Sequence, residues 1–363
     1  MGLEYQIEVL LREMADAEAS DLIITTTIPP QFRINGRLTP VAGEPMEAED
    51  TLQLARSLLT EQQFQKLEQM RSVDFSVGFA GIGRFRVNAF YQRGSVALAI
   101  RMIPYVIPCI DELGLPSIVK QFAMRTQGLV LFTGPTGSGK STSLAALIQY
   151  INERQRRHIV CIEDPIEYGH TNKMSVIEQR EILDDAHTFQ DAMRSVFRQD
   201  PDVVMIGEMR DLETISLALS LAETGHLILA TLHTNDAISA IMRISSVFPS
   251  HEKQHVQAQL SMVLNGVIAQ NLIETCDEKR RVLAYEVMVM NGAIANLIRD
   301  GQVQQMYSAL QTGKAEGMIT MNECLARLVQ SETITPASAM ERSPKPRELA
   351  RMINYDDHVP MAS

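Results

Sequence analysis

The sequence predicts an α/β protein of two domains: a mixed α+β domain at residues 1–103, a linker at 104–116, and an α/β domain at 117–363 that ends in helices. Three observations favour this organisation. The chain has 363 residues, which is more than one hydrophobic core usually serves. Strands in its first third alternate polar and apolar residues, whereas later strands are short, continuous apolar runs separated by helical stretches.

The expected N-terminal domain begins with a helix within residues 3–19, where apolar residues recur at helical spacing: Leu3, Ile7, Leu10, Leu11 and Met14. DLIITTTIPP and QFRINGRLTPV read as short strands, and Asn35-Gly36 predicts a hairpin turn because a type I′ turn needs two positive φ angles. A helical stretch from Glu49 to Met70 has a second start near Thr60. VDFSVGF, RFRVNAFYQRG and SVALAIRMI then predict strands up to about residue 103.

The linker is marked by its composition, with Pro104, Pro108, Gly114 and Pro116. Beyond it lie four continuous apolar runs: GLVLFTG, HIVCIED, DVVMIGE and HLILATLH. Such runs suit strands that are covered on both faces, so they predict a doubly wound parallel sheet. From residue 250 onward the pattern predicts mostly helix, apart from a strand in RVLAYEVMVM at 281–290.

Composition argues against several classes of function. A formal net charge of −11 does not suit a surface built to bind nucleic acid or anionic lipid. Four cysteines without CxxC spacing indicate neither a zinc site nor a disulfide framework. Because the sequence has no signal-peptide core and no uninterrupted apolar stretch of about 18 residues, we expect a cytoplasmic protein that does not insert into a membrane.

The strongest chemical signal is GPTGSGKS at residues 134–141, which matches the phosphate-binding pattern GxxxxGK(S/T). It follows the apolar run GLVLFT and opens the helical stretch STSLAALIQYIN, which is the context that such a loop requires. Its amides are expected to cradle phosphates, with Lys140 at the β- and γ-phosphates and the Ser141 hydroxyl on magnesium. The alternative is a glycine-rich turn that binds nothing. The expected nucleotide-binding residues are Gly134, Pro135, Thr136, Gly137, Ser138, Gly139, Lys140, Ser141 and Thr142.

Carboxylates end two of the apolar runs. In CIEDPIEY, Glu163, Asp164 and Glu167 come at the edge where ligands of parallel sheets bind, so a cation or hydrogen-bond donors should meet them. The alternative is a solvated acidic loop. In VVMIGEMRD, Glu208 is preceded by Gly207, although a nucleotide-hydrolysing sheet usually places a magnesium-binding aspartate near this point.

Two histidines flank the run LILATL, His226 before it and His233 after it. Either side chain could simply cap the strand. Since they are seven residues apart, they should point to opposite faces. His233, at the carboxyl end where the ligand crevice lies, is the better candidate for sensing a γ-phosphate.

Taken together, GPTGSGKS, IEDPIE, IGEMRD and TGHLILATLHTN resemble, in order and spacing, the secretion ATPases that power type II secretion and type IV pili. GRFRVNAFYQRG, QREI, DLETISLALSLAETGH and GAIANLIRDGQVQQMYSALQTG are most similar to the pilus retraction, or twitching motility, ATPases of the PilT type. The resemblance covers nearly the whole chain. It implies a PAS-like N-terminal domain, a RecA-like P-loop ATPase domain with a helical C-terminal extension, and ATP with Mg²⁺.

The resemblance also implies roles for particular residues. Glu208 would orient or activate the attacking water, while Glu163, with Ser141, would arrange water around magnesium. The family forms hexameric rings in which N-terminal arginines complete the site of the next subunit, which here would be Arg84, Arg86 and Arg101. Alternating arginines on a strand also line solvated faces. Rivals within the same subunit are Arg194, Arg198 and Arg210.

The function implied is a homohexameric, ATP-hydrolysing motor for type IV pilus retraction. It would lie at the cytoplasmic face of the inner membrane and act on pilin indirectly, through the pilus platform protein. In GAIANLIR, Ala295 replaces the first arginine of the AIRNLIR common in these ATPases, which leaves an accessory or assembly-side paralogue open. A helicase-like or DNA-translocating ring fits the acidic composition less well, and a subunit that does not turn over ATP fits the motif set less well.

Overall fold

The computed structural model describes residues 6–34 and 36–355. These residues fall into two compact units, one within 1–106 together with 167–169, and the other within 107–166 together with 170–363. Leu3 and Asn35, which the sequence places in a helix and a hairpin turn, lie outside the described residues. Gly36 has φ +80°, the left-handed conformation that this turn requires.

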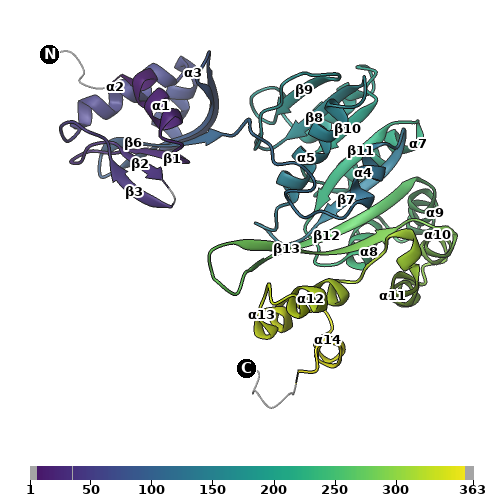
Figure 1. Ribbon diagram of the computed structural model, residues 1–363. Helices are drawn as coiled ribbons and strands as arrows, with labels where there is room; N and C mark the ends of the chain where they lie inside the picture. The colour runs from purple at the N-terminus through teal and green to yellow at the C-terminus, as the bar shows by residue number, and fades with distance from the viewer. Residues whose placement is uncertain (1–5, 35, 356–363) are drawn as a thin grey trace. The chain divides into compact units, whose positions relative to one another are not determined.

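The N-terminal unit is a six-stranded antiparallel sheet packed with helices, as Figure 1 shows in purple and blue. The sheet order is β3-β2-β1-β6-β5-β4. Its elements are α1 (Ile7–Asp16), β1 (Asp21–Ile24), β2 (Gln31–Ile34), β3 (Arg37–Pro40), α2 (Ala48–Leu58), α3 (Glu61–Met70), β4 (Ser72–Phe79), β5 (Gly83–Gln92) and β6 (Ser95–Ile103). The mixed α+β prediction is confirmed, and Thr60 caps α3 through a capping box with Gln63.

The second unit is built on a seven-stranded sheet of order β13-β12-β7-β11-β10-β8-β9. All neighbours are parallel except β12 and β13, which are antiparallel. The strands are β7 (Gly128–Thr133), β8 (His158–Glu163), β9 (Val176–Glu181), β10 (Val203–Ile206), β11 (Leu227–Leu232), β12 (Leu264–Glu274) and β13 (Arg281–Val289). Strands β7, β10 and β11 are buried along their whole length, which confirms the prediction made from their continuous apolar runs.

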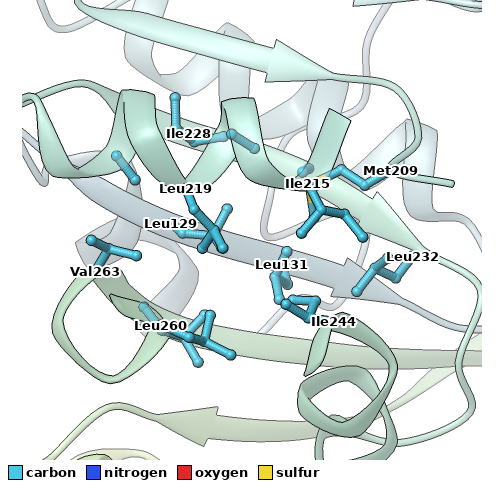
Figure 2. Packing of buried hydrophobic residues seen from close by; sticks show 14 of the residues in the cluster. Leu129, Leu131, Met209, Ile215, Leu219, Ile228, Leu232, Ile244, Leu260 and Val263 are labelled. Atoms are coloured by element: carbon cyan, nitrogen blue, oxygen red, sulfur yellow. The ribbon is translucent and has the colours of Figure 1, made fainter. Parts of the chain in front are cut away.

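Helices cover both faces of this sheet. One face carries α6 (Phe189–Val196), α7 (Leu212–Glu223), α8 (Ala237–Ser246), α9 (Lys253–Val263), α10 (Gly292–Arg299) and α11 (Val303–Thr312). Figure 2 shows part of this packing: Leu129 and Leu131 of β7 lie among side chains of α7, α8 and α9. The other face carries α4 (Ile118–Ala123), α5 (Lys140–Asn152), α12 (Met321–Gln330), α13 (Pro336–Arg342) and α14 (Pro346–Met352).

One sequence prediction is wrong, because residues 264–274 form β12 and not helix. The run LNGVIAQNLIE follows α9 without a proline break, and polar residues interrupt its apolar pattern. It is nevertheless hydrogen-bonded between β7 and β13, so pairing on both sides overrides the local pattern. β9 was also not among the expected strands, since VIEQRE is a largely polar edge strand.

The proline-rich segment 104–116 contains no helix or strand. Ile110 and Leu115 are nevertheless buried in the core of the second unit, beside residues of α4. Within residues 6–34 and 36–355, no helix combines the length and apolarity needed to cross a bilayer.

Candidate active site

The glycine-rich loop lies between β7 and α5, as the sequence predicts. Gly134, Gly137 and Gly139 all have positive φ, at 148°, 78° and 89°. Gly134 also has no room for a side chain, because a Cβ there would lie 2.4 Å from the Gln270 carbonyl oxygen. Local sequence thus permits a loop geometry that other residues would strain.

Lys140, the first residue of α5, points back across this loop. Its Nζ donates to the carbonyl oxygens of Gly134 at 2.8 Å and Pro135 at 2.9 Å. The same Nζ lies 3.5 Å from Nδ1 of His233. The ammonium group is therefore placed at the mouth of the loop and in reach of the residue that follows β11.

Glu208 lies between two cationic or hydrogen-bonding partners just beyond β10. Its Oε2 accepts from Arg210 Nη2 at 2.7 Å, and its Oε1 lies 3.2 Å from His233 Nε2. Burial raises the pKa of Glu208, but the hydrogen bond from Arg210 and the charge of His233 outweigh it and lower the pKa below its ordinary value. Glu208 is therefore ionised at neutral pH. His233 thus lies between Glu208, which faces its Nε2, and Lys140, which faces its Nδ1.

Gly207 brings β10 close to β8. Its amide donates to the Ile162 carbonyl at 2.8 Å. A Cβ at this position would lie 3.2 Å from that carbonyl oxygen and 3.4 Å from Glu163 Cα. The contact is tighter than ordinary van der Waals packing, so an aspartate at position 207 would push against the backbone that carries Glu163.

Glu163 is the last residue of β8, and it is 8% exposed. Its Oε1 accepts from Gln179 Nε2 of β9 at 3.0 Å. Asp164 and Glu167 are exposed, so the acidic stretch divides into one buried carboxylate and a solvated loop. Because β8 and β10 are adjacent and parallel, Glu163 and Glu208 lie at neighbouring strand ends.

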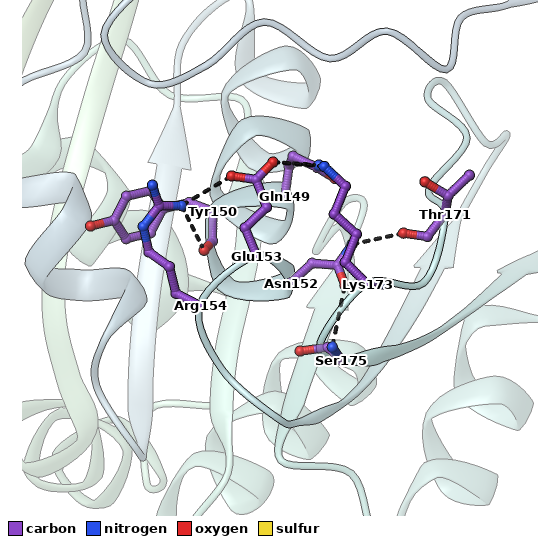
Figure 3. Close-up of polar contacts among 8 residues, drawn as sticks. All are labelled: Gln149, Tyr150, Asn152, Glu153, Arg154, Thr171, Lys173 and Ser175. Carbon is purple, nitrogen blue, oxygen red and sulfur yellow. Dashed lines mark hydrogen bonds and ion pairs between the residues drawn. The ribbon is translucent and has the colours of Figure 1, made fainter.

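The segment that leads to Gln179 is anchored at the far end of α5 (Figure 3). The buried Asn152 side chain donates to the Thr171 carbonyl at 2.8 Å and accepts from the Lys173 amide at 2.9 Å. Glu153 pairs with Lys173 at 2.8 Å, and this hydrogen bond is the main reason that its pKa is lowered to about 2. The helix that begins at the phosphate loop therefore also fixes the approach to β9.

Some contacts at the site were not expected from the sequence. Thr133, at the end of β7, accepts from the Thr234 amide at 2.9 Å and donates to the Thr234 carbonyl at 2.6 Å. Gln179 hydrogen-bonds Glu163 and Arg210 hydrogen-bonds Glu208, and the sequence predicts neither contact. The available sequence signal is that each is a polar residue close to a strand end that carries a motif carboxylate.

The loop fits a phosphate-bearing ligand. Ser138 Oγ is buried and has no hydrogen-bond partner among the described residues. The N-cap of α5, Gly139, makes no side-chain cap, so no capping side chain competes with an anion for this helix end. No group of three or more His, Cys, Asp or Glu in the described ranges could hold a metal. A magnesium ion bound with a nucleotide would not require such a group, because the Ser141 hydroxyl, phosphate oxygens and water can supply its ligands.

The three N-terminal arginines lie in the other unit, on its antiparallel sheet. Arg86 of β5 is exposed and pairs across the strands with Arg101 of β6. Arg101 donates from Nε to Asp21 at 2.8 Å. Arg84 precedes them on β5 and is partly buried. The structure brings together Lys140, Glu208, Arg210 and His233, and a role for the N-terminal arginines stays a prediction.

His226 and His233 occupy opposite ends of β11. His226 Nδ1 lies 2.9 Å from the Leu221 carbonyl and 3.1 Å from Thr224 Oγ1, which is a local structural role. His233 lies with Glu208 and Lys140.

The doubly wound sheet and its glycine loop define a P-loop nucleotide-binding protein. The chain matches the Type II/IV secretion system protein family over residues 2–342, and it belongs to that family. It is 43% identical to the type IV pilus retraction ATPase PilT of Pseudomonas aeruginosa, over 94% of this chain and 98% of the relative. It is 41% identical to the type IV pilus ATPase PilU of the same organism, over 96% of this chain and 91% of the relative.

A solved structure described as the pilus retraction motor PilT with bound ADP is similar to this chain with a TM-score of 0.89. The identity is 46%, and the match covers 96% of this chain and all of that chain. The two-domain α/β architecture expected from the sequence is thereby confirmed.

Proposed function

We propose that this protein is an ATPase that powers retraction of a type IV pilus. The observation that carries the proposal is the meeting of Lys140, Glu208 and His233 at the carboxyl edge of the sheet, beside a phosphate loop. Support comes from relatives of nearly full length that are named as type IV pilus ATPases.

Within this proposal each side chain has a task. The loop amides and Lys140 hold the ATP phosphates, and the Ser141 hydroxyl would hold a magnesium ion, which would supply charge neutralisation at the phosphate oxygens. Glu208 is ionised and held on two sides, so it can orient a water and accept its proton. Glu163, fixed by Gln179, would orient the water ligands of such an ion. His233 links Glu208 with Lys140 and so responds to the γ-phosphate.

The assembly in the proposal is a homohexamer in which Arg84, Arg86 or Arg101 acts on the nucleotide of the neighbouring subunit. Phosphoryl transfer spreads negative charge over the equatorial oxygens, and Lys140 with magnesium covers only part of it. The exposure of Arg86 suits such a contribution, whereas Arg210 is engaged by Glu208 within the same subunit. The motor acts through the platform protein at the cytoplasmic face of the inner membrane and reaches pilin indirectly.

A second candidate is an accessory type IV pilus ATPase. It is favoured by the 41% identity to PilU and by Ala295, which is half-buried on α10 at the position where the family resemblance implies an arginine.

An in-frame deletion tests the proposal. Loss of a retraction motor leaves cells with excess surface pili and no twitching, whereas bald cells indicate a role in assembly. An accessory role predicts reduced twitching with near-normal piliation. Complementation with Glu208→Gln should fail, while Glu13→Gln, an exposed carboxylate on α1, should restore the wild-type phenotype. Normal piliation and normal twitching after deletion would contradict both candidates.

A further inference from the structure

A buried carboxylate outside the nucleotide site begins this argument. Glu286 of β13 is 2% exposed, and a carboxylate at such a position needs hydrogen-bond donors. Its Oε1 accepts from the Ala237 amide at 2.9 Å, and its Oε2 lies 3.3 Å from the Met321 amide. Ala237 and Met321 are the first residues of α8 and α12. One side chain therefore binds the N-terminal ends of two different helices.

The α8 end of this contact leads directly to the nucleotide site. Asp236 caps α8, and His233 and Thr234 come just before it. Thr234 is hydrogen-bonded to Thr133, the residue before Gly134 of the phosphate loop. A change in the loop that repositions His233 therefore acts on the helix end that Glu286 binds.

The α12 end leads into the C-terminal helices. Thr320 caps α12 and accepts from the Glu323 amide at 3.2 Å. Asn322, one residue beyond Met321, donates to the Lys345 carbonyl at 3.0 Å, just ahead of α14. The first turn of α12 thus fixes the position of the last helix that the structure describes.

We propose that Glu286 is a positioning residue that couples nucleotide binding at the phosphate loop to the first turn of α12. The inference rests on the proposed function, because it requires a nucleotide at this loop. The amides at the two helix ends bind the same carboxylate, and Glu286 is fixed in β13 by its pairing with β12. A shift of α8 would therefore alter the hydrogen bond to α12. Burial raises the pKa of Glu286 to about 7 and the two amide bonds oppose that rise, so loss of either bond disfavours the charged form.

Amide hydrogen exchange measured by mass spectrometry, with and without saturating ADP, tests the coupling. In the wild type, ADP should slow exchange in residues 321–325 by about 5-fold or more, the lower end of typical allosteric coupling. In Glu286→Gln the carboxamide can accept from only one of the two amides, so this slowing should disappear. Protection of the phosphate loop itself and the affinity for ADP should remain, because Glu286 touches neither.

A second pair of variants keeps Glu286 intact. Met321→Pro removes the amide donor at the first helical position, where proline is tolerated and where Thr320 already has an extended ψ of 155°. Met321→Ala loses the same buried side chain but keeps the amide. Only the proline variant should lose the response of the α12 turn to ADP. If Glu286→Gln does not fold, this pair of variants still tests the coupling.

The outcomes separate the two proposals. Wild-type protein that binds ADP without any change at residues 321–325 overturns the coupling alone. So does a response that survives in Glu286→Gln or in Met321→Pro. Wild-type protein that binds no nucleotide overturns the proposed function, and the coupling with it.

Discussion

The charged residues of the two sheets lie in different surroundings. Glu208, at the carboxyl edge of the parallel sheet, is 19% exposed in its side chain and is bonded on both sides, to Arg210 and His233. Arg101, on the antiparallel sheet, is 69% exposed and has Asp21 as its partner. A parallel sheet covered on both faces forces its polar groups to be paired, whereas an antiparallel sheet can present a row of charges to solvent.

The two sheets therefore differ in whether their charged side chains are paired within their own unit or exposed to solvent. The carboxylates and Lys140 are held in place by residues of their own unit. Arg86 of β5 and Arg101 of β6 are exposed, and we predict that they act on a second copy of the chain. Three substitutions test this difference, and they are given in order of decreasing expected effect on turnover.

The largest effect is expected for Arg86→Ala. If Arg86 stabilises the transition state in a neighbouring subunit, turnover should fall by about three to five decades, as for established arginine fingers. Mixing Arg86→Ala with Glu208→Gln protein, each inactive alone, should then restore activity at about a quarter of the interfaces of randomly mixed 1:1 rings. Steady-state ATPase assays before and after subunit exchange measure the recovery.

Two controls accompany this experiment. Arg37→Ala changes an exposed arginine of β3 in the same sheet and should leave turnover unchanged. A mixture of Lys140→Ala and Glu208→Gln removes two residues of the same site, so no interface is repaired and no activity should return. If labelled subunits exchange and the Arg86 mixture stays inactive, the arginine does not act between subunits.

The next effect concerns Glu208. Glu208→Gln should retain ATP binding while turnover falls by at least about two decades, the scale for a lost catalytic base. The change removes a full charge, because Arg210 and His233 lower the pKa of Glu208 despite its burial. Lys140→Ala should weaken nucleotide binding itself. Binding by fluorescent ATP analogues and turnover assays separate the two variants, and near-normal turnover of Glu208→Gln would exclude this role.

The sequence predicted Glu163 and Glu208 as site residues because each comes at the end of a continuous apolar run, and parallel strands end at one edge of a sheet. It could not predict their partners, since Gln179 reaches Glu163 from β9 and Thr234 reaches Thr133 from a strand end 101 residues away. Pairing also decided β12, whose local pattern favours helix. In GAIANLIR, Ile298 is 1% exposed and Leu297 only partly buried, a distinction that spacing alone did not reveal.

Substitution of Gly207 should have the smallest effect on turnover. It can be compared directly with a glycine substitution on the antiparallel sheet. Gly207→Ala places a Cβ 3.2 Å from the Ile162 carbonyl and 3.4 Å from Glu163 Cα, so β8 must yield by a few tenths of an ångström. We expect a loss of about 1 kcal/mol in the free energy of unfolding, at the low end for overpacking. Turnover should fall more than ATP affinity, because the strain falls on Glu163 and not on the phosphate loop.

Gly78→Ala is the matched control for this change. Gly78 lies on β4 of the antiparallel sheet, it is exposed, and a Cβ there would meet no atom within 4 Å. Its substitution should be neutral or stabilise the fold by about 0.5 kcal/mol, because alanine loses less backbone entropy than glycine. Gly207→Asp should be worse than Gly207→Ala in both stability and turnover, since the larger side chain increases the crowding. If Gly207→Asp instead kept full activity, steric closeness to β8 would not be the reason that glycine stands where an acidic residue is usual.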